Sequence, residues 1–334
     1  MTIHFNTTFA SRRSLLGAGA AVALGSLSGS LWAQAAYPSR PITVLVPYAP
    51  GGQGDVFARL IGNRLSQVLK QPVVVENRPG ASGALGSRLL AQAKGDGYTL
   101  MLGQTGEIAV NGSVMKNPGY DALKDFKPVA LVGDAPLVMA APANAPYNSV
   151  QELLQLARDK PDSISYGSSG TATPGHLAGA ALAIGTKTKM VHIPYKGAGQ
   201  AMTDLIGGQV QFFFSSASAV MPHIKGGKVK ALAVSTPKRI KALPQIPTIA
   251  ETGIPGFSFS LWGGYFAPAE TPDAVVQFLN QEINKILLEP EIRARFDADS
   301  SSIEPGSPVE FASYVRNEIT KYVALVKATG VQAE

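Results

Sequence analysis

The 334-residue chain contains no cysteine and only four histidines. The lack of cysteine excludes disulfides, thiolate chemistry and cysteine-ligated zinc. His176, His192 and His223 stand in no His-x-x-x-His or similar spacing, so the sequence predicts neither a metal site nor a cofactor. Without disulfides the fold must be stabilised by its core. The 45% of hydrophobic residues can supply one large core or, more readily, two smaller ones.

The chain also has little net charge, because basic and acidic residues nearly balance. The formal net charge is +6, and it falls by two to +4 when Arg12 and Arg13 are removed with an N-terminal segment that holds no acid. This excess is small and unclustered, which gives no basic patch for nucleic acid. It mildly favours small anionic ligands.

The beginning of the chain has the pattern of an export signal. Ser11, Arg12 and Arg13 precede an apolar stretch rich in alanine and glycine, and a small-x-small pattern ends at Ala35. We therefore expect residues 1–35 to be a signal peptide of twin-arginine-like type, cleaved near Ala35 and Ala36, with the mature protein in the periplasm. The general secretory route stays open. A membrane anchor is disfavoured because residues 15–31 contain four glycines and three serines.

The first strand, loop and helix organise the rest of the sequence. A β-branched run at 42–46 predicts a buried strand, the loop 48–54 is rich in glycine, and helical spacing of apolar residues follows with Asp55 as the expected N-cap. Such a helix start leaves free N–H groups and a positive dipole end, which suit an anion. The loop matches neither G-x-G-x-x-G nor the Walker pattern, and an ordinary βα turn remains the alternative.

The same order of elements returns in the middle of the chain. A short strand at 164–166 leads into a loop rich in hydroxyl groups at 167–175 and an apolar helix at 176–184, for which Thr173 is the expected N-cap. Strands are also expected at 129–132, 137–141, 257–261 and 264–267. This alternation predicts an α/β protein of two related lobes with mostly parallel sheets and ligands beyond the strands' carboxyl ends.

Nine segments resemble the tripartite tricarboxylate transporter substrate-binding proteins, also called the Bug or TctC family. They cover the expected mature chain in order and are 41–55 (PITVLVPYAPGGQGD), 75–83 (VENRPGASG), 97–100 (GYTL), 167–170 (GSSG), 176–179 (HLAG), 193–197 (IPYKG), 204–209 (DLIGGQ), 222–234 (PHIKGGKVKALAV) and 242–257 (ALPQIPTIAETGIPGF).

The resemblance implies a two-lobed periplasmic binding protein of type II, or Venus-flytrap, architecture. It would close on a small aliphatic or aromatic carboxylate and deliver it to the membrane permease subunits of a tripartite tricarboxylate transporter. We expect lobe 1 at 36–137 and 259–334 and lobe 2 at 138–258, a monomer, no enzymatic activity and no nucleic-acid partner.

The resemblance also implies a set of ligand-binding residues on the loops that face one another. They are Tyr48, Gly51, Gly52, Gln53, Asp55, Gln104, Thr105, Ser168, Ser169, Thr171, Thr173, Lys196, Ser215 and Ser216. Lys196 is a candidate charge partner for a carboxylate, although a loop lysine is usually solvated.

One departure from the family narrows the ligand. Relatives often have an acidic residue after the strand at 210–214, whereas this chain has Ser215, Ser216 and Ser218. An amino acid would lack a partner for its ammonium group, so we expect a carboxylate without an amine. Aromatic side chains could form an apolar wall or simply pack in the core; the candidates are Phe212, Phe214, Phe257 and Trp262.

Three alternatives remain at the level of sequence. An exported hydrolase could use Ser168 or Ser169, although neither lies in a G-x-S-x-G frame. A sensory protein could bind the ligand without a dedicated permease. An exported interaction protein would use its surface alone and have no deep cleft.

Overall fold

A central sheet of ten strands organises the chain, whose computed structural model describes residues 1–4 and 37–332. The twin-arginine pattern and the expected cleavage site lie outside the described residues. Residues Arg40–Glu334 form one unit, to which the described sheet and helices belong. The sheet order is β2-β1-β3-β9-β4-β7-β5-β6, with β8 and β10 also pairing to β4.

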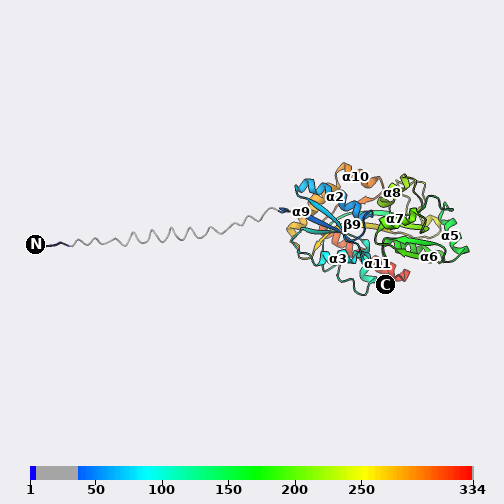
Figure 1. Cartoon of the computed structure of the whole chain (residues 1–334), viewed down its shortest axis with the longest axis horizontal. Coiled ribbons are helices and arrows are strands. Elements are labelled where there is room, and N and C mark those ends of the chain that lie inside the picture. The colour runs from blue at the N-terminus through cyan, green and yellow to red at the C-terminus, as the bar shows by residue number, and fades with distance from the viewer. Residues whose placement is uncertain (5–36, 333–334) are drawn as a thin grey trace. The chain divides into compact units, whose positions relative to one another are not determined.

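The first half of the sheet combines parallel and antiparallel strands. Strands β1 (Ile42–Val46), β2 (Val73–Asn77) and β3 (Thr99–Gln104) are parallel, as their β-branched and apolar runs predict. The long strand β9 (Ser260–Pro268) is antiparallel to β3 and to β4. Helices α2 (Gln53–Leu69), α3 (Ala84–Ala91) and α9 (Asp273–Leu287) surround this half (Figure 1).

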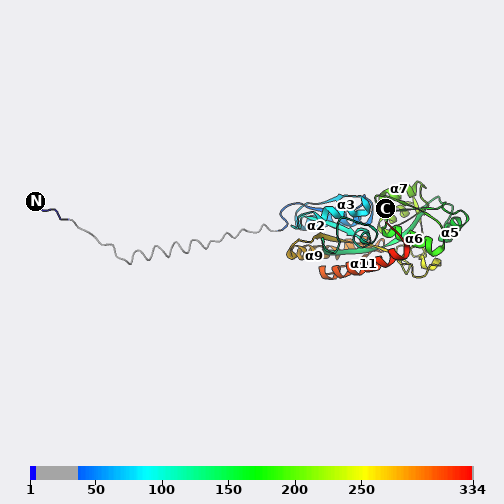
Figure 2. The ribbon, with the colours of Figure 1, turned by 90° about the horizontal axis from the view of Figure 1, so that it is seen from below.

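The second half repeats this arrangement. Strands β6 (Val191–Pro194), β5 (Ser165–Ser168) and β7 (Phe212–Ser216) are parallel, and β8 (Val229–Val234) and β7 are antiparallel to β4. The helices of this half are α5 (Val150–Asp159), α6 (Pro174–Thr186), α7 (Ala198–Ile206) and α8 (Ala217–Lys225). Figure 2 shows α5, α6 and α7 beyond the ends of α2, α3 and α9. The α/β expectation is confirmed, with antiparallel strands making each half mixed.

Strand β4 (Phe126–Pro142) connects the two halves. Its first part, up to Pro136, pairs with β9, and its last part, from Leu137, pairs with β7 and β8. The prediction of two separate strands at 129–132 and 137–141 was wrong, as was the division of β9 at 261–264. A continuous strand runs through residues 133–136 because β9 and β10 pair with them, and the register with β9 is irregular near Gly133.

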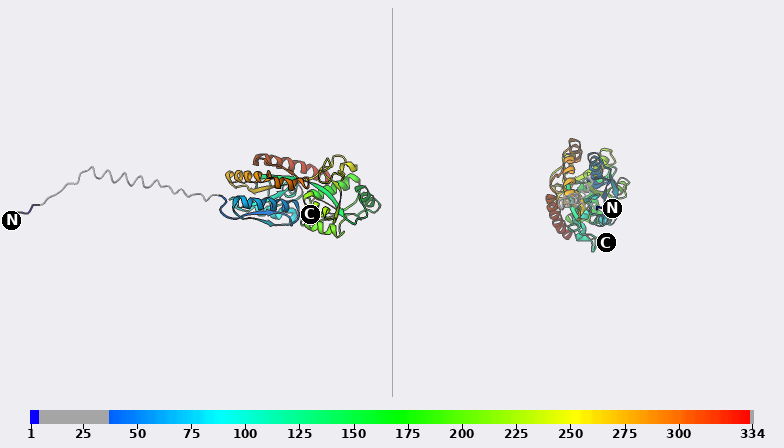
Figure 3. Two further views of the ribbon diagram at one scale, coloured as in Figure 1. Left: turned by 90° about the horizontal axis from the view of Figure 1, so that it is seen from above. Right: turned by 90° about the vertical axis from the view of Figure 1, so that its left-hand side faces the viewer.

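The remaining elements complete the two halves. They are the short helices η1 (Ala81–Gly83), η2 (Gly106–Val110, a π-helix), α4 (Asn111–Val114) and η3 (Ala250–Thr252), the helices α10 (Pro290–Asp297) and α11 (Pro308–Thr329), and the two-residue strand β10 (Ser302–Ile303). Helix α11 lies along the same side of the unit as α9 (Figure 3). Among the described helices, none combines the length and hydrophobicity that a membrane span requires.

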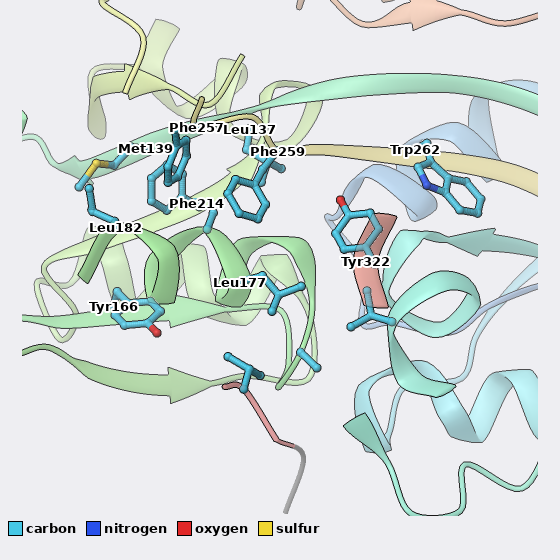
Figure 4. Packing of buried hydrophobic residues seen from close by; sticks show 14 of the residues in the cluster. Leu137, Met139, Tyr166, Leu177, Leu182, Phe214, Phe257, Phe259, Trp262 and Tyr322 are labelled. Carbon is cyan, nitrogen blue, oxygen red and sulfur yellow. The ribbon is translucent and has the colours of Figure 1, made fainter. Parts of the chain in front are cut away.

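Buried aromatic and aliphatic side chains form a core that continues across both halves. Figure 4 shows Phe214, Phe257 and Phe259 together with Leu137, and Trp262 beside Tyr322 further along. The rings of Phe214 and Phe257 are 5.9 Å apart, and those of Phe257 and Phe259 are 4.9 Å apart. Such packing of large buried rings stabilises a fold that has no disulfides.

Candidate functional site

A cavity of about 40 Å³ lies where the two halves of the sheet face one another. Its walls combine small polar groups with a few apolar side chains, which is usual for a small-molecule site. The lining residues are Tyr48, Gly52, Gln53, Gln104, Gly106, Leu137, Ser169, Thr173, Pro174, Gly175, Ala198, Phe214, Ser215, Ser216 and Leu261.

Four α-helices begin at this cavity. Helices α2, α6, α7 and α8 have Gly52, Thr173, Gly197 and Ser216 as N-caps, and each contributes its N-cap or its first residue to the lining. None of the four N-cap side chains accepts a hydrogen bond from the first turn. On α5 and α11, by contrast, the N-cap serine does so. The cavity therefore receives several positive dipole ends and N–H groups that no side chain caps.

No Asp, Glu, Lys, Arg or His is among the described residues that line the cavity. An anion in this cavity would therefore meet backbone N–H groups, hydroxyls and amides rather than a cation. Equally, the lining provides no carboxylate to pair with a ligand ammonium group.

Hydrogen bonds fix the polar side chains of the first wall. Gln104 Nε2 donates to Gln53 Oε1 at 3.1 Å, and the Gln53 amide donates to the carbonyl oxygen of Leu261. The hydroxyl of Tyr48 donates to Glu107 Oε2 at 2.8 Å. The two glutamines thus connect the first wall to strand β9, which crosses behind the cavity.

Of the fourteen residues expected at the site, eight line the cavity. They are Tyr48, Gly52, Gln53, Gln104, Ser169, Thr173, Ser215 and Ser216. Strands β1, β3, β5 and β7 all end at this edge of the sheet, as the sequence predicts for ligand loops.

Asp55 has a different place from the one expected. The N-cap of helix α2 is Gly52, three residues before Asp55, so that prediction was wrong. The carboxylate turns away from the cavity and accepts hydrogen bonds from Arg59 and Asn77. Although burial opposes it, these bonds and the N–H of Gly51 lower the pKa of Asp55. Its role is to hold the start of α2.

Five other expected residues lie beside the cavity rather than in its wall. Thr105 Oγ1 accepts the backbone N–H of Trp262 at 3.0 Å, and Gly51 packs against Gly199. Thr171 and Lys196 line a neighbouring hollow together with Tyr48. Thr173, which does line the cavity, is the N-cap of α6, as predicted.

Ser168, the fifth, is fully buried and does not line the cavity. Its hydroxyl donates to the carbonyl oxygen of Gly170 at 2.8 Å and is 2.7 Å from His192 Nε2. The hydroxyl oxygen also accepts the Gly170 N–H at 3.2 Å, and no part of Ser168 is exposed to solvent, whereas a nucleophile must be reached by its substrate. This geometry gives the hydrolase alternative no accessible nucleophile at Ser168.

Sequence reasoning missed several lining residues because they are apolar or lack a side chain. Leu137, Leu261 and Ala198 resemble ordinary core positions, and Gly106 and Gly175 carry no chemistry of their own. Of the four aromatic candidates, Phe214 lines the cavity. Phe212, Phe257 and Trp262 are buried in the core.

Comparison with known proteins gives a consistent result. The sequence model described as "Tripartite tricarboxylate transporter family receptor" matches residues 57–331. Protein BugT of Bordetella pertussis is 34% identical over 89% of this chain and 91% of its own length.

Two solved structures are similar over nearly their whole length. The periplasmic binding protein BugD is 34% identical with a TM-score of 0.85, covering 89% of this chain and 100% of that one. A protein of R. palustris with adipate is 33% identical with a TM-score of 0.86, covering 89% and 99%. These relatives are solute-binding proteins with two lobes. The chain belongs to the tripartite tricarboxylate transporter family receptors, which include the Bug proteins.

Proposed function

We propose that this chain is a periplasmic solute-binding protein that captures a small carboxylate without an ammonium group and delivers it to a tripartite tricarboxylate-type permease. The observation that carries the proposal is the meeting of four helix N-termini without side-chain caps at a cavity that has no charged side chain. Helix N-termini stabilise anions, and N–H groups with no other partner are ready donors for carboxylate oxygens.

The lining also favours particular carboxylates. Leu137, Phe214 and Leu261 supply an apolar wall that would contact methylene groups or an aromatic ring. An amino acid would place its ammonium group among neutral dipoles, which leaves the charge desolvated and without a partner. Adipate, the compound bound by the R. palustris relative, has the features that this wall suits: two carboxylates and an apolar middle.

The cavity is lined by residues of both halves of the sheet, so we expect the two lobes to close on the ligand when it binds. In the proposed division, lobe 1 comprises 36–137 and 259–334 and lobe 2 comprises 138–258, so β4 and the segment before β9 act as the hinge. The carboxylate first meets the start of α2 in lobe 1. The starts of α6, α7 and α8 in lobe 2 then approach it and stabilise the closed form. A permease would recognise that closed form of the monomer.

The test is ligand-dependent thermal stability of the mature protein. We expect adipate, malate, citrate or benzoate to raise the melting temperature, and aspartate and glutamate to have no effect. A ligand at a hundredfold excess over its dissociation constant stabilises the fold by about 2.7 kcal/mol, which raises the midpoint by a few degrees. Stabilisation by amino acids alone would contradict the proposed ligand class.

A matched pair of variants at Gly52 tests whether the ligand binds in this cavity. Gly52 has φ −89° and ψ 174°, which any residue adopts, and a Cβ there would be 3.4 Å from Ala198 Cβ. Gly52→Ala should therefore fold and bind, whereas Gly52→Leu should fold and lose binding because its side chain enters the cavity. Normal affinity in Gly52→Leu would contradict the proposed site.

A further inference from the structure

Glu107 lies directly behind the cavity wall and is fully buried in the π-helix η2. Its Oε2 accepts the hydroxyl proton of Tyr48 at 2.8 Å, and its Oε1 accepts the backbone N–H of Gln104 at 2.5 Å. Tyr48 and Gln104 both line the cavity. One buried carboxyl group therefore holds two residues of the proposed site.

The Tyr48 hydroxyl also faces the second half of the molecule. A Cβ built on Gly106 would lie 2.6 Å from the Tyr48 hydroxyl oxygen and 3.6 Å from Thr173 Cγ2, so the three residues meet at the cavity. Tyr48 has one hydroxyl proton. The hydroxyl lies 2.8 Å from Glu107 Oε2 and 3.2 Å from the carbonyl oxygen of Ser82, so both of these acceptors compete for its proton. While the proton is given to either of them, the hydroxyl presents only lone pairs to a ligand, which is unfavourable for a carboxylate.

No cation neutralises Glu107 in the part of the chain that the structure describes. The ionisable groups near it are Tyr48 from the first loop and Tyr120, whose hydroxyl donates to the backbone carbonyl of Glu107 at 2.5 Å. Arg88 of α3 is close enough to Tyr120 for its positive charge to lower the pKa of the Tyr120 hydroxyl slightly, against the larger increase caused by burial. Lys116, Asp121 and the apolar Ile319 and Val323 of α11 line a hollow on the outer side of η2. On α11, Glu318 is paired with Lys321 and accepts the indole N–H of Trp262.

Burial raises the pKa of Glu107 to about 7, although the hydrogen bonds from Gln104 and Tyr48 oppose the shift. The carboxyl group can therefore exist in either form near neutral pH. A ligand carboxylate placed against Tyr48 and Gln104 would be a second negative charge in the same desolvated region, and it would favour the protonated form of Glu107.

We propose, on the basis of the proposed carboxylate binding, that Glu107 positions Tyr48 and Gln104 for the ligand and takes up one proton from solvent when the anion enters. The added proton resides on Glu107 Oε2 and is donated to the Tyr48 oxygen. The Tyr48 hydroxyl proton then turns into the cavity and is donated to the ligand carboxylate rather than to the Ser82 carbonyl oxygen 3.2 Å away, because a charged acceptor forms the stronger hydrogen bond. Glu107 Oε1 keeps the Gln104 N–H. No covalent bond other than that to the transferred proton changes. Glu107 is thus a positioning residue with a titration linked to binding.

The experiment is calorimetric titration of the mature protein with adipate, malate, citrate and benzoate, repeated in phosphate and Tris buffers. The heats in two buffers of different ionisation enthalpy give the number of protons taken up. For each compound that binds the wild type, we expect uptake approaching one proton above pH 7, with affinity falling up to about tenfold per pH unit.

Glu107→Gln keeps the shape of the side chain and can donate to Tyr48. We expect it to bind with no proton uptake and with affinity that changes less than about twofold from pH 6 to pH 8. Glu318→Gln is the matched control, because it removes another buried glutamate that lies outside the cavity, and it should retain the wild-type pH profile. A merely structural role for Glu107 would change affinity but leave the proton count unaltered.

The outcomes are distinguishable. Binding by the wild type without proton uptake, or equal uptake in Glu107→Gln, would overturn this inference and leave the proposed function intact. If none of the four carboxylates binds the wild type, the proposed function fails and this inference with it.

Discussion

The backbone N–H of Ala49 donates to the backbone carbonyl oxygen of Lys196 at 3.1 Å. Ala49 follows β1 and Lys196 follows β6, so this hydrogen bond joins the first loop of one half to the loop before α7 in the other. The residues around it are small. A Cβ on Gly197 would lie 2.8 Å from the Ala49 nitrogen, and a Cβ on Gly199 would overlap the carbonyl oxygen of Pro50.

This contact predicts that Gly199→Ala hinders closure. The added methyl group meets a backbone atom, which cannot move aside as a flexible side chain could, so the two loops must separate. Because closure supplies part of the binding free energy, we expect affinity for the ligand to fall by about tenfold, equivalent to about 1.4 kcal/mol. Calorimetry measures the affinity, and small-angle scattering with and without ligand measures closure.

The control for Gly199→Ala is Gly112→Ala in α4, where nothing lies within 4 Å of the added Cβ. It should leave affinity and scattering unchanged. Wild-type affinity in Gly199→Ala would show that the observed contact between the loops is not required for binding.

Helix α11 has a side-chain N-cap, whereas the helices that begin at the cavity do not. We therefore expect loss of the α11 cap to change the stability of the fold but not the binding of the ligand. Ser307 caps α11 in a capping box with Glu310, far along the chain from the cavity lining. Ser307→Ala should lower the free energy of unfolding by about 1 kcal/mol and leave ligand affinity unchanged. Denaturant unfolding and calorimetry on the same samples give both quantities.

Ser169→Ala should have the opposite effect. Ser169 lines the cavity, and a hydrogen bond from its hydroxyl to a charged ligand would contribute about 1.5–3 kcal/mol. We expect affinity to fall by about tenfold or more, with a change in unfolding free energy within about 0.5 kcal/mol. A loss of stability without a loss of affinity would assign Ser169 to the fold alone.

The sequence predicts the strands, the loops at their carboxyl ends and the order of the helices, because β-branched runs, glycine loops and helical spacing are local signals. Prediction from the sequence fails where contacts with distant parts of the chain determine the secondary structure. The residues Gly133, Asp134, Ala135 and Pro136 have the composition of a turn, yet they continue β4 because β9 and β10 pair with them. Local composition does not show that a distant strand will supply these pairs.

The site shows the same limit. Loops rich in glycine and hydroxyl groups identify where a ligand would bind, but the start of α2 at Gln53 rather than Asp55 decides which side chain faces the cavity. Leu137 and Leu261 were not predicted because a leucine beside a cavity has the same sequence signal as a leucine in the core.

The neutral lining of the cavity predicts the effect of an added charge. Ser215 is buried at the end of β7, and no lysine or arginine among the described residues lines the cavity beside it. Ser215→Asp would place a carboxylate against the ligand anion in a desolvated site. We expect affinity for carboxylates to fall by about a hundredfold or more, because like charges at such distances repel strongly. Calorimetry at pH 7.5 measures the loss.

Ser215→Asn separates the charge from the size of the side chain. It has nearly the same shape as aspartate, and it should lose much less affinity. Equal losses in both variants would mean that space at Ser215, rather than charge, limits the ligand.

His176 and His192 predict a loss of stability in acid. Their rings are stacked with centroids 3.6 Å apart, and the N–H of Ala172 donates to His176 Nδ1 at 2.9 Å, which requires that nitrogen to be unprotonated. Burial lowers the pKa of His176 to about 4. Burial, and then the neighbouring imidazole, lowers that of His192 to about 3. Between the ordinary pKa of histidine, about 6.5, and these values the unfolded chain binds more protons than the folded one, so stability falls as the pH falls.

The measurement is denaturant unfolding from pH 7 to pH 4 for the wild type and His176→Gln. Glutamine keeps an oxygen that can accept the Ala172 N–H but cannot be protonated, so we expect the variant to lose less stability in acid. The difference should approach at most about 1.4 kcal/mol per pH unit.

Comparison of the two proteins is needed because burial raises the pKa of Asp134 to about 6, and that carboxyl stabilises the fold in acid. His223→Gln, on the partly exposed side of α8, controls for loss of a histidine as such. Parallel curves for wild type and His176→Gln would contradict a neutral, buried histidine pair.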